Sequence, residues 1–113
     1  MISISTHALN TSSGKPAKGL NLHLERNTGN NTWERIANGT TNDDGRAPGL
    51  IPAERILSMG VYRMVFDTGG YFTATGVQGF YPIVEVVFEI REESHYHIPL
   101  LLSPYGYSTY RGS

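Results

Sequence analysis

A strict alternation of apolar and polar side chains runs through Leu20-Asn21-Leu22-His23-Leu24-Glu25. Successive side chains of a β-strand point to opposite faces of the sheet, so this period of two predicts a strand with one buried face. The same period recurs in Ile2-Ser3-Ile4-Ser5, in Val84-Glu85-Val86-Val87-Phe88-Glu89-Ile90 and in Tyr96-His97-Ile98-Pro99-Leu100. The sequence therefore predicts a β protein.

Turn-forming residues separate these segments. They lie in Ser12-Ser13-Gly14-Lys15-Pro16, Asn27-Thr28-Gly29-Asn30-Asn31, Asn42-Asp43-Asp44-Gly45 and Thr68-Gly69-Gly70. Such clusters favour tight turns and positive φ angles, which indicates short strands with local connections. With seven or eight short strands and no alternation of strands and helices, we expect a sandwich of two antiparallel sheets packed face to face.

Two segments could form short helices, namely Pro52 to Leu57, where proline suits a first helical turn, and about Gly69 to Thr75. A chain of 113 residues suffices for one domain of modest size, which we expect to span residues 1–113. The sequence contains no internal repeat or low-complexity tract, so nothing in it indicates a second domain.

The composition excludes several classes of function. Lys and Arg number 9 against 10 Asp and Glu, which leaves no basic field to attract nucleic acid or an anionic membrane. The absence of cysteine excludes disulfides and thiolate zinc sites, and it suits a reducing compartment. No apolar stretch is long enough to span a bilayer, and the N-terminus lacks the pattern of a secretory signal. We therefore expect a cytoplasmic protein without a membrane or nucleic-acid partner.

Three histidines lie opposite the predicted core. On the strand from His95 to Leu102, one face carries Tyr96, Ile98, Leu100 and Leu102, and the other carries His95 and His97. In the first strand, His7 falls on the face opposite Ile2 and Ile4. An outward imidazole is usually a solvated surface residue, and it takes part in chemistry only where something buries and orients it. The pattern alone leaves both interpretations open.

Arg46 and the C-terminus each allow two interpretations. Arg46 follows the turn Asn42-Asp43-Asp44-Gly45 and is either a solvated hairpin arginine or a fixed positive charge at a site. The aromatic segment Tyr105 to Ser113 alternates like a strand, which suggests a docked terminus or a simple edge strand.

Five blocks of the sequence resemble the 5-hydroxyisourate hydrolases, also called transthyretin-related proteins. In family order, they are Ser5 to Thr11, Thr41 to Arg46, Phe80-Tyr81-Pro82, His95 to Pro104 and Tyr110-Arg111-Gly112-Ser113. The last is the most specific, because it separates the hydrolases from the hormone-carrying transthyretins that share their fold. The blocks reach from one end of the chain to the other.

The resemblance implies an active site lined by His7, Arg46, His97, Tyr110 and Ser113, with Arg111 as a further substrate contact. It implies a transthyretin-like (prealbumin-like) sandwich with one short helix, in which two protomers pair edge to edge. Two such dimers form a homotetramer around a channel that holds the substrate. No cofactor and no metal are expected, and His95 has no role that the resemblance supplies.

The implied reaction is hydrolysis of 5-hydroxyisourate to 2-oxo-4-hydroxy-4-carboxy-5-ureidoimidazoline. Water must be activated, a ring carbonyl attacked and negative charge on its oxygen stabilised. A neutral imidazole can act as the general base, a role that we assign jointly to His7 and His97. Arg46 can hold the anionic substrate and oppose the developing charge. Tyr110 and Ser113 offer hydroxyls that could orient the ring or the water.

Two other classes of function remain as alternatives. The first is a transthyretin-like carrier whose channel binds a small molecule without chemistry, although polar His7, Arg46 and His97 are poor partners for an apolar ligand. The second is a zinc enzyme in which His95 and His97 on one strand face are joined by His7. No carboxylate partner is evident for such a site.

Overall fold

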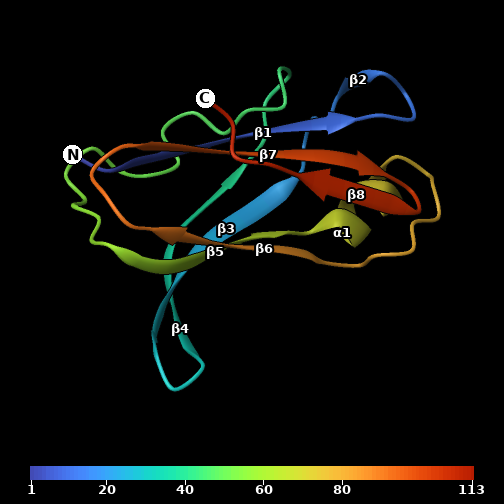
Figure 1. Ribbon diagram of the computed structural model, residues 1–113. Coiled ribbons are helices and arrows are strands. Elements are labelled where there is room, and N and C mark those ends of the chain that lie inside the picture. The colour runs from blue at the N-terminus through green and yellow to red at the C-terminus, as the bar shows by residue number, and fades with distance from the viewer.

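The computed structural model describes all 113 residues, which form eight strands and one helix (Figure 1). In chain order they are β1 (Ser3–Asn10), β2 (Lys15–Pro16), β3 (Asn21–Gly29), β4 (Thr32–Thr40), β5 (Gly60–Phe66), α1 (Thr68–Ala74), β6 (Val84–Ile90), β7 (His95–Ser103) and β8 (Gly106–Thr109). One four-stranded sheet has the order β2-β1-β7-β8 and the other the order β4-β3-β5-β6. The expected sandwich with one short helix is confirmed.

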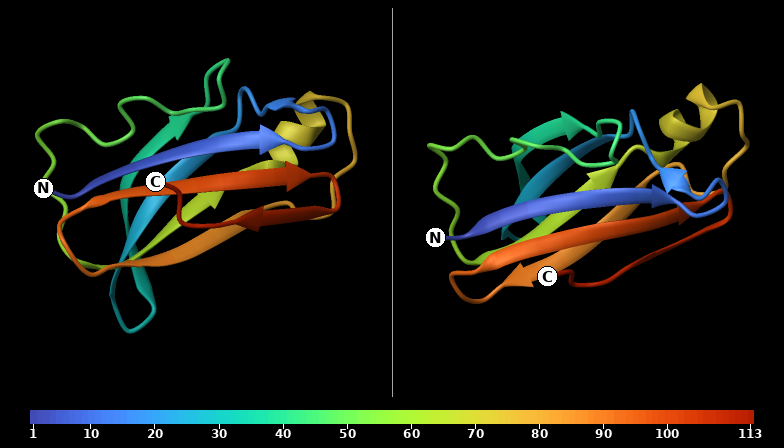
Figure 2. Two further views of the ribbon diagram at one scale, coloured as in Figure 1. Left: turned by 45° about the horizontal axis from the view of Figure 1, so that its top comes forward. Right: turned by 90° about the horizontal axis from the view of Figure 1, so that it is seen from above.

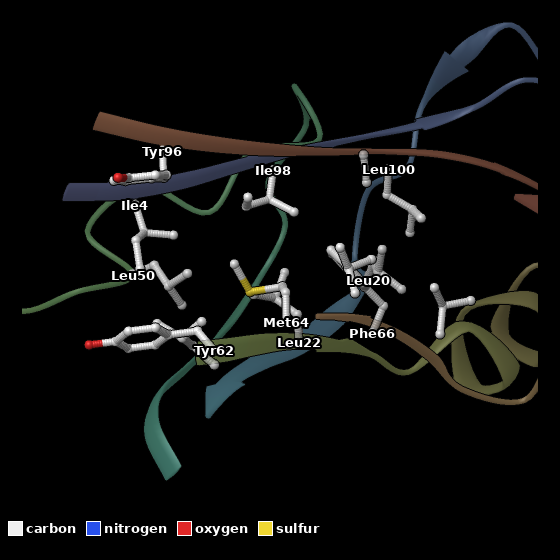
Figure 3. Close-up of a cluster of buried hydrophobic side chains, with 14 of the residues drawn as sticks. Ile4, Leu20, Leu22, Leu50, Tyr62, Met64, Phe66, Tyr96, Ile98 and Leu100 are labelled. Atoms are coloured by element: carbon white, nitrogen blue, oxygen red, sulfur yellow. The ribbon is translucent and has the colours of Figure 1, made fainter. Parts of the chain in front are cut away.

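The two sheets enclose one apolar core. The inward faces of β1 and β7 carry Ile4, Tyr96, Ile98 and Leu100, and those of β3 and β5 carry Leu22, Tyr62, Met64 and Phe66, all of them buried. Figure 3 shows these side chains pointing from the two sheets toward one another. Burying one such side chain contributes about 1.5–3 kcal/mol, so the alternation in the sequence fixes which face of each strand turns inward.

One pairing differs from the expected antiparallel arrangement. β1 and β7 run parallel, with Ser3 opposite His95, Ser5 opposite His97 and His7 opposite Pro99. Figure 2 shows the two strands side by side and pointing the same way. A period of two reveals the faces of a strand but not its direction, and no hairpin joins these two strands, so the sequence pattern did not reveal this pairing.

The two helix expectations have different outcomes. α1 lies where the segment Gly69 to Thr75 was expected, and the Asp67 carboxylate caps it by accepting from the Gly70 N–H at 3.0 Å. The segment Pro52 to Leu57 is not a helix but a single turn, closed by the bond from the Arg55 N–H to the Pro52 carbonyl. Only Leu57 in it is buried, so little packing supports a longer helix there. The protein has no helix with the length and apolar character needed to cross a bilayer.

Candidate active site

The candidate site lies on the outer face of the sheet that contains β1 and β7. Tyr96 and Ile98 point into the core, so His95 and His97 point outward, as the sequence predicted, with His97 partly buried. On β1, the buried Ile4 and Thr6 leave His7 on the same outward face. In Figure 1 the C-terminus lies on this side of the sheet, away from β3 and β5.

The turn from Asn42 to Arg46 brings a guanidinium beside β1. Arg46 is paired with His7 in an isolated antiparallel bridge, and directly opposed residues project to the same face. The Asn42 side-chain oxygen accepts from the N–H groups of Asp44 at 2.9 Å and Arg46 at 3.1 Å. The Ala8 N–H donates to the Gly45 carbonyl at 2.8 Å, which fastens the turn to the strand.

The same turn fixes the tautomer of His7. Its Nε2 lies 2.8 Å from the Asp44 carbonyl oxygen. A carbonyl oxygen can only accept, so Nε2 carries the hydrogen and the lone pair of the neutral ring is on Nδ1. Nδ1 has no partner within the protein and is not enclosed, which leaves it free to accept a hydrogen bond.

His97 is held by β1 through the parallel register. The Ser5 hydroxyl lies 2.7 Å from Nδ1 of His97 and 2.9 Å from Nε2 of His95. The Ser3 hydroxyl lies 2.6 Å from Nδ1 of His95. Nε2 of His97 has no partner within the protein and is not enclosed, so it is open to a substrate or a water molecule.

The C-terminal segment packs directly against His97. The Gly112 N–H donates to the His97 carbonyl at 2.9 Å, and the two residues form an antiparallel bridge. A Cβ at residue 112 would lie 2.4 Å from Cδ2 of the imidazole, far inside van der Waals contact. A larger residue at this position would displace the imidazole or the terminal segment, and this contact brings Ser113 into the neighbourhood of His97.

Tyr110 and Arg111 lie elsewhere in the protomer. The Arg111 guanidinium stacks over the Tyr96 ring, 4.4 Å from its centroid, and Nη2 donates to the His95 carbonyl at 3.4 Å. Both residues line a cleft beside β6 that Val86 and Phe88 also border. The protomer therefore gathers His7, Arg46 and His97 on one face, and contact of Tyr110 or Arg111 with substrate stays a prediction.

The electrostatic surroundings favour a neutral His97. Burial foremost lowers the pKa of the His97 imidazole below its ordinary value of 6.5. The guanidinium charge of Arg46 and the electrostatic interactions with His7 and His95 act on the pKa of that imidazole in the same direction. An imidazole that is neutral at pH 7 can accept a proton, which is what a general base requires.

The histidine pair on β7 does not converge as a zinc site would require. The rings of His95 and His97 lie nearly parallel, with an interplanar angle of 18° and centroids 6.5 Å apart. One nitrogen of each ring is bonded to the same Ser5 hydroxyl. No three His, Cys, Asp or Glu side chains in the chain are grouped to hold a metal ion.

A second polar cluster lies on the outer face of the other sheet. Arg63 is bonded to the Glu25 carboxylate, its guanidinium stacks 4.1 Å from the centre of the Trp33 ring, and His23 lies 3.1 Å from the same carboxylate. Burial by itself raises the pKa of the Glu25 carboxyl. The hydrogen bond and positive charge of Arg63, together with the interaction with His23, outweigh burial and hold that pKa below its ordinary value. These groups satisfy one another, as in a structural cluster.

Ser5 and Gly112 are the site residues that the sequence reasoning missed. The alternation of β1 placed Ser5 on the outward face with His7, which was a usable signal. Its contact with His97 depends on a pairing between segments 92 residues apart, and the contact of Gly112 depends on the path of the last residues. Neither is encoded in a local pattern.

Comparisons with known proteins identify the family of this chain. The HIUase/Transthyretin family model matches residues 4–112. A 5-hydroxyisourate hydrolase of Mus musculus is 47% identical over 112 residues, covering 97% of this chain and 94% of the mouse protein.

Solved structures show the same fold in two kinds of protein. The 5-hydroxyisourate hydrolase of Klebsiella pneumoniae superposes with a TM-score of 0.86 at 36% identity, over 100% of this chain and 94% of that one. Sea bream transthyretin in complex with thyroxine gives a TM-score of 0.89 at 35% identity, over 96% and 93%. The chain therefore belongs to the HIUase/Transthyretin family.

Proposed function

We propose that this protein is a 5-hydroxyisourate hydrolase. The observation that carries the proposal is the meeting of two imidazoles and a guanidinium, those of His7, His97 and Arg46, on one open face of the β1–β7 sheet. The relatives named 5-hydroxyisourate hydrolase, including the mouse protein at 47% identity, support the same assignment. In this proposal residues 1–113 act as one hydrolase domain.

The proposed chemistry divides among three side chains. His7 and His97 supply the base that takes a proton from water, and a positioned general base contributes about a hundred- to ten-thousand-fold. Water adds to a ring carbonyl, and the carbonyl electron pair moves onto oxygen. Arg46 opposes that negative charge, a contribution of about 10² to 10³ for one good donor. Opening of the carbon–nitrogen bond then yields 2-oxo-4-hydroxy-4-carboxy-5-ureidoimidazoline.

Water, rather than a serine, is the nucleophile in this scheme. Ser5 is the serine whose hydroxyl contacts His97, but that hydroxyl is held between His95 and His97. It contacts Nδ1 of His97, and no carboxylate bonds the opposite nitrogen as a Ser-His-acid triad requires. The open atoms are Nε2 of His97 and Nδ1 of His7, and a water molecule between substrate and these nitrogens is well placed for activation.

The proposal includes a homotetramer, a dimer of dimers. Outward imidazoles need burial to become reactive, and a second dimer over this face would supply it. Exposed aromatic side chains, including Tyr107 and Tyr110 near β8, offer apolar surface for pairing between protomers. The C-terminal Tyr110, Arg111 and Ser113 would then complete the substrate-binding site within the assembly, without a cofactor.

We place this activity in the cytoplasm as part of urate degradation. The absence of cysteine suits a reducing compartment, and the net charge of −1 gives no attraction to nucleic acid or anionic lipid.

A transthyretin-like carrier is the second candidate, since sea bream transthyretin shares the fold and was solved with thyroxine. The outer face of the β1–β7 sheet argues against it here. His7, Arg46 and His97 would each have to be dehydrated by an apolar ligand without compensating partners, which is costly.

The direct test follows the ultraviolet absorbance of freshly made 5-hydroxyisourate with and without protein. We expect decay much faster than in buffer, and a large loss of that acceleration in His7→Asn and His97→Asn. The matched control is His23→Asn, which makes the same change on the opposite sheet and should retain wild-type turnover. Decay no faster than the spontaneous rate would overturn the proposed function.

A further inference from the structure

The Ser5 hydroxyl is shared between two imidazoles. It lies 2.7 Å from Nδ1 of His97 and 2.9 Å from Nε2 of His95, and it is partly buried. The parallel register places Ser5 directly opposite His97 and Ser3 opposite His95, so these four side chains form a row on one face. The row begins at the exposed Ser3 hydroxyl and ends at His97.

A single hydroxyl hydrogen limits how this row can be bonded. Ser5 has one O–H, so if it donates to one imidazole it must accept from the other. In the first arrangement Nδ1–H of His97 donates to Ser5, which donates to Nε2 of His95, whose Nδ1–H donates to Ser3. In the second arrangement every bond is reversed, and the hydrogen of His97 then lies on Nε2.

The surroundings of His97 favour the first arrangement. Nε2 is the nitrogen without a partner in the protein, and the neighbouring Arg46 guanidinium adds positive charge to this region. A nearby cation favours the tautomer in which Nε2 of His97 carries a lone pair over the tautomer in which Nε2 carries a hydrogen. A base that attacks from the open side also needs its lone pair on Nε2.

We propose that Ser5 is a positioning residue that holds His97 in the Nδ1–H tautomer and so presents the lone pair of Nε2 to the attacking water. The consequence for catalysis rests on the proposed hydrolase function, but the tautomer itself does not. His95 supports the arrangement by accepting the Ser5 hydrogen at Nε2.

The proton and electron movements balance with Nε2 of His97 as the atom that takes the proton. Nε2 takes one proton from water while the water oxygen bonds to the ring carbonyl carbon. The carbonyl electron pair moves to its oxygen near Arg46. When the carbon–nitrogen bond breaks, the imidazolium returns the proton from Nε2 to the departing nitrogen. Throughout, Nδ1–H stays bonded to Ser5, and this bond strengthens when the ring is charged.

The kinetic test compares Ser5→Ala with Ser5→Thr. Ser5→Ala should lower kcat about tenfold with little change in KM. The reason is that the His97 base loses its orientation while the contacts of the substrate are unchanged. Ser5→Thr keeps a hydroxyl on a residue suited to strands and should restore most of kcat. Ser58→Ala, an exposed serine elsewhere, is the matched control. Unchanged kcat in Ser5→Ala would overturn the proposal.

A second readout does not depend on activity. Nitrogen NMR of the protein labelled at histidine should show His97 with hydrogen on Nδ1 in the wild type and in Ser5→Thr, and a shift toward Nε2–H in Ser5→Ala. A wild-type His97 with hydrogen on Nε2 would overturn the proposal whatever the turnover. Absence of turnover in the wild type would instead contradict the proposed function alone.

Discussion

Burial and the nearby charge of Arg46 lower the pKa of His97, and in the proposed mechanism this lowered pKa sets the acid side of the pH response. Burial first, and then Arg46 and the other imidazoles, lower the pKa of His97 below 6.5. Acidification through that lowered pKa protonates the base, so kcat/KM should fall only at pH values below 6.5 and be level at neutral pH. The same lowering of the His97 pKa makes the free energy of unfolding depend on pH. The unfolded chain takes up the proton first, so the His97 contribution disfavours folding as the pH drops.

Replacing Arg46 tests both of its proposed effects. Arg46→Gln should lower kcat by about 10² to 10³, because the carbonyl oxygen loses its charged partner. It should also move the acidic limb of kcat/KM to higher pH, since one cause of the lowered His97 pKa is gone. Arg35→Gln, an exposed arginine on β4, is the control for both measurements. A limb that stays in place would show that Arg46 does not act on the base.

Gly112 allows a test of the contact between the C-terminus and His97. In Gly112→Ala the new methyl would lie 2.4 Å from Cδ2 of the ring, so the imidazole or the terminal segment must shift. A displacement of about 1 Å at a reacting group costs on the order of 10² in rate, and we expect kcat to fall by about that factor.

Gly106→Ala is the matched control for that variant, because its new methyl meets only Ser103 Oγ at 3.5 Å, an ordinary contact. Both variants should unfold near the wild-type temperature. If Gly112→Ala kept full turnover, the terminal segment would have no part in placing His97.

At the scale of elements, the turn from Asn42 to Arg46 carries two site features at once. It supplies the Arg46 guanidinium and the Asp44 carbonyl that fixes His7, and it is fastened to β1 through Gly45. Gly45 has φ of +77°, and a Cβ there would lie 2.3 Å from the Ala8 carbonyl oxygen. Backbone conformation and close approach both require glycine at this position.

Gly45→Ala should therefore destabilise the protein and lower its activity. The positive φ alone costs about 1–2 kcal/mol for a residue with a Cβ, and the collision with Ala8 adds to it. Gly49→Ala separates the two causes, since Gly49 has φ of +69° but nothing within 4 Å of its Cβ position. Urea unfolding at equal protein concentration should rank Gly45→Ala as the less stable variant. Equal stabilities would contradict the close packing of this turn.

The strand faces were predictable from local pattern, whereas strand partners were not. Alternation correctly put His7, His95 and His97 outside and Tyr96 inside, because burial of apolar side chains dominates the choice of face. The parallel pairing of β1 and β7 was missed, and with it the contact of Ser5 and His97. The roles of Arg46 and the histidines came from family resemblance, since an outward charge has no periodic signature. The segment Pro52 to Leu57 had a helix-start signal but too little packing to form a helix.

At the scale of the whole molecule, the site of one protomer is open. His7 and His97 are only partly buried and Arg46 is exposed, so water screens their charges in the isolated chain. Covering this face by a second dimer would exclude that water and strengthen each interaction. Catalysis is therefore expected to be a property of the proposed tetramer and not of the fold alone.

Active-enzyme sedimentation tests this claim most directly. The protein is centrifuged through a solution of 5-hydroxyisourate, and the loss of ultraviolet absorbance gives the sedimentation coefficient of the species that consumes the substrate. We predict that substrate loss travels with a tetramer and that slower-moving protein leaves the absorbance at its spontaneous rate of decay. Substrate loss that travels with a fully active monomer would contradict it.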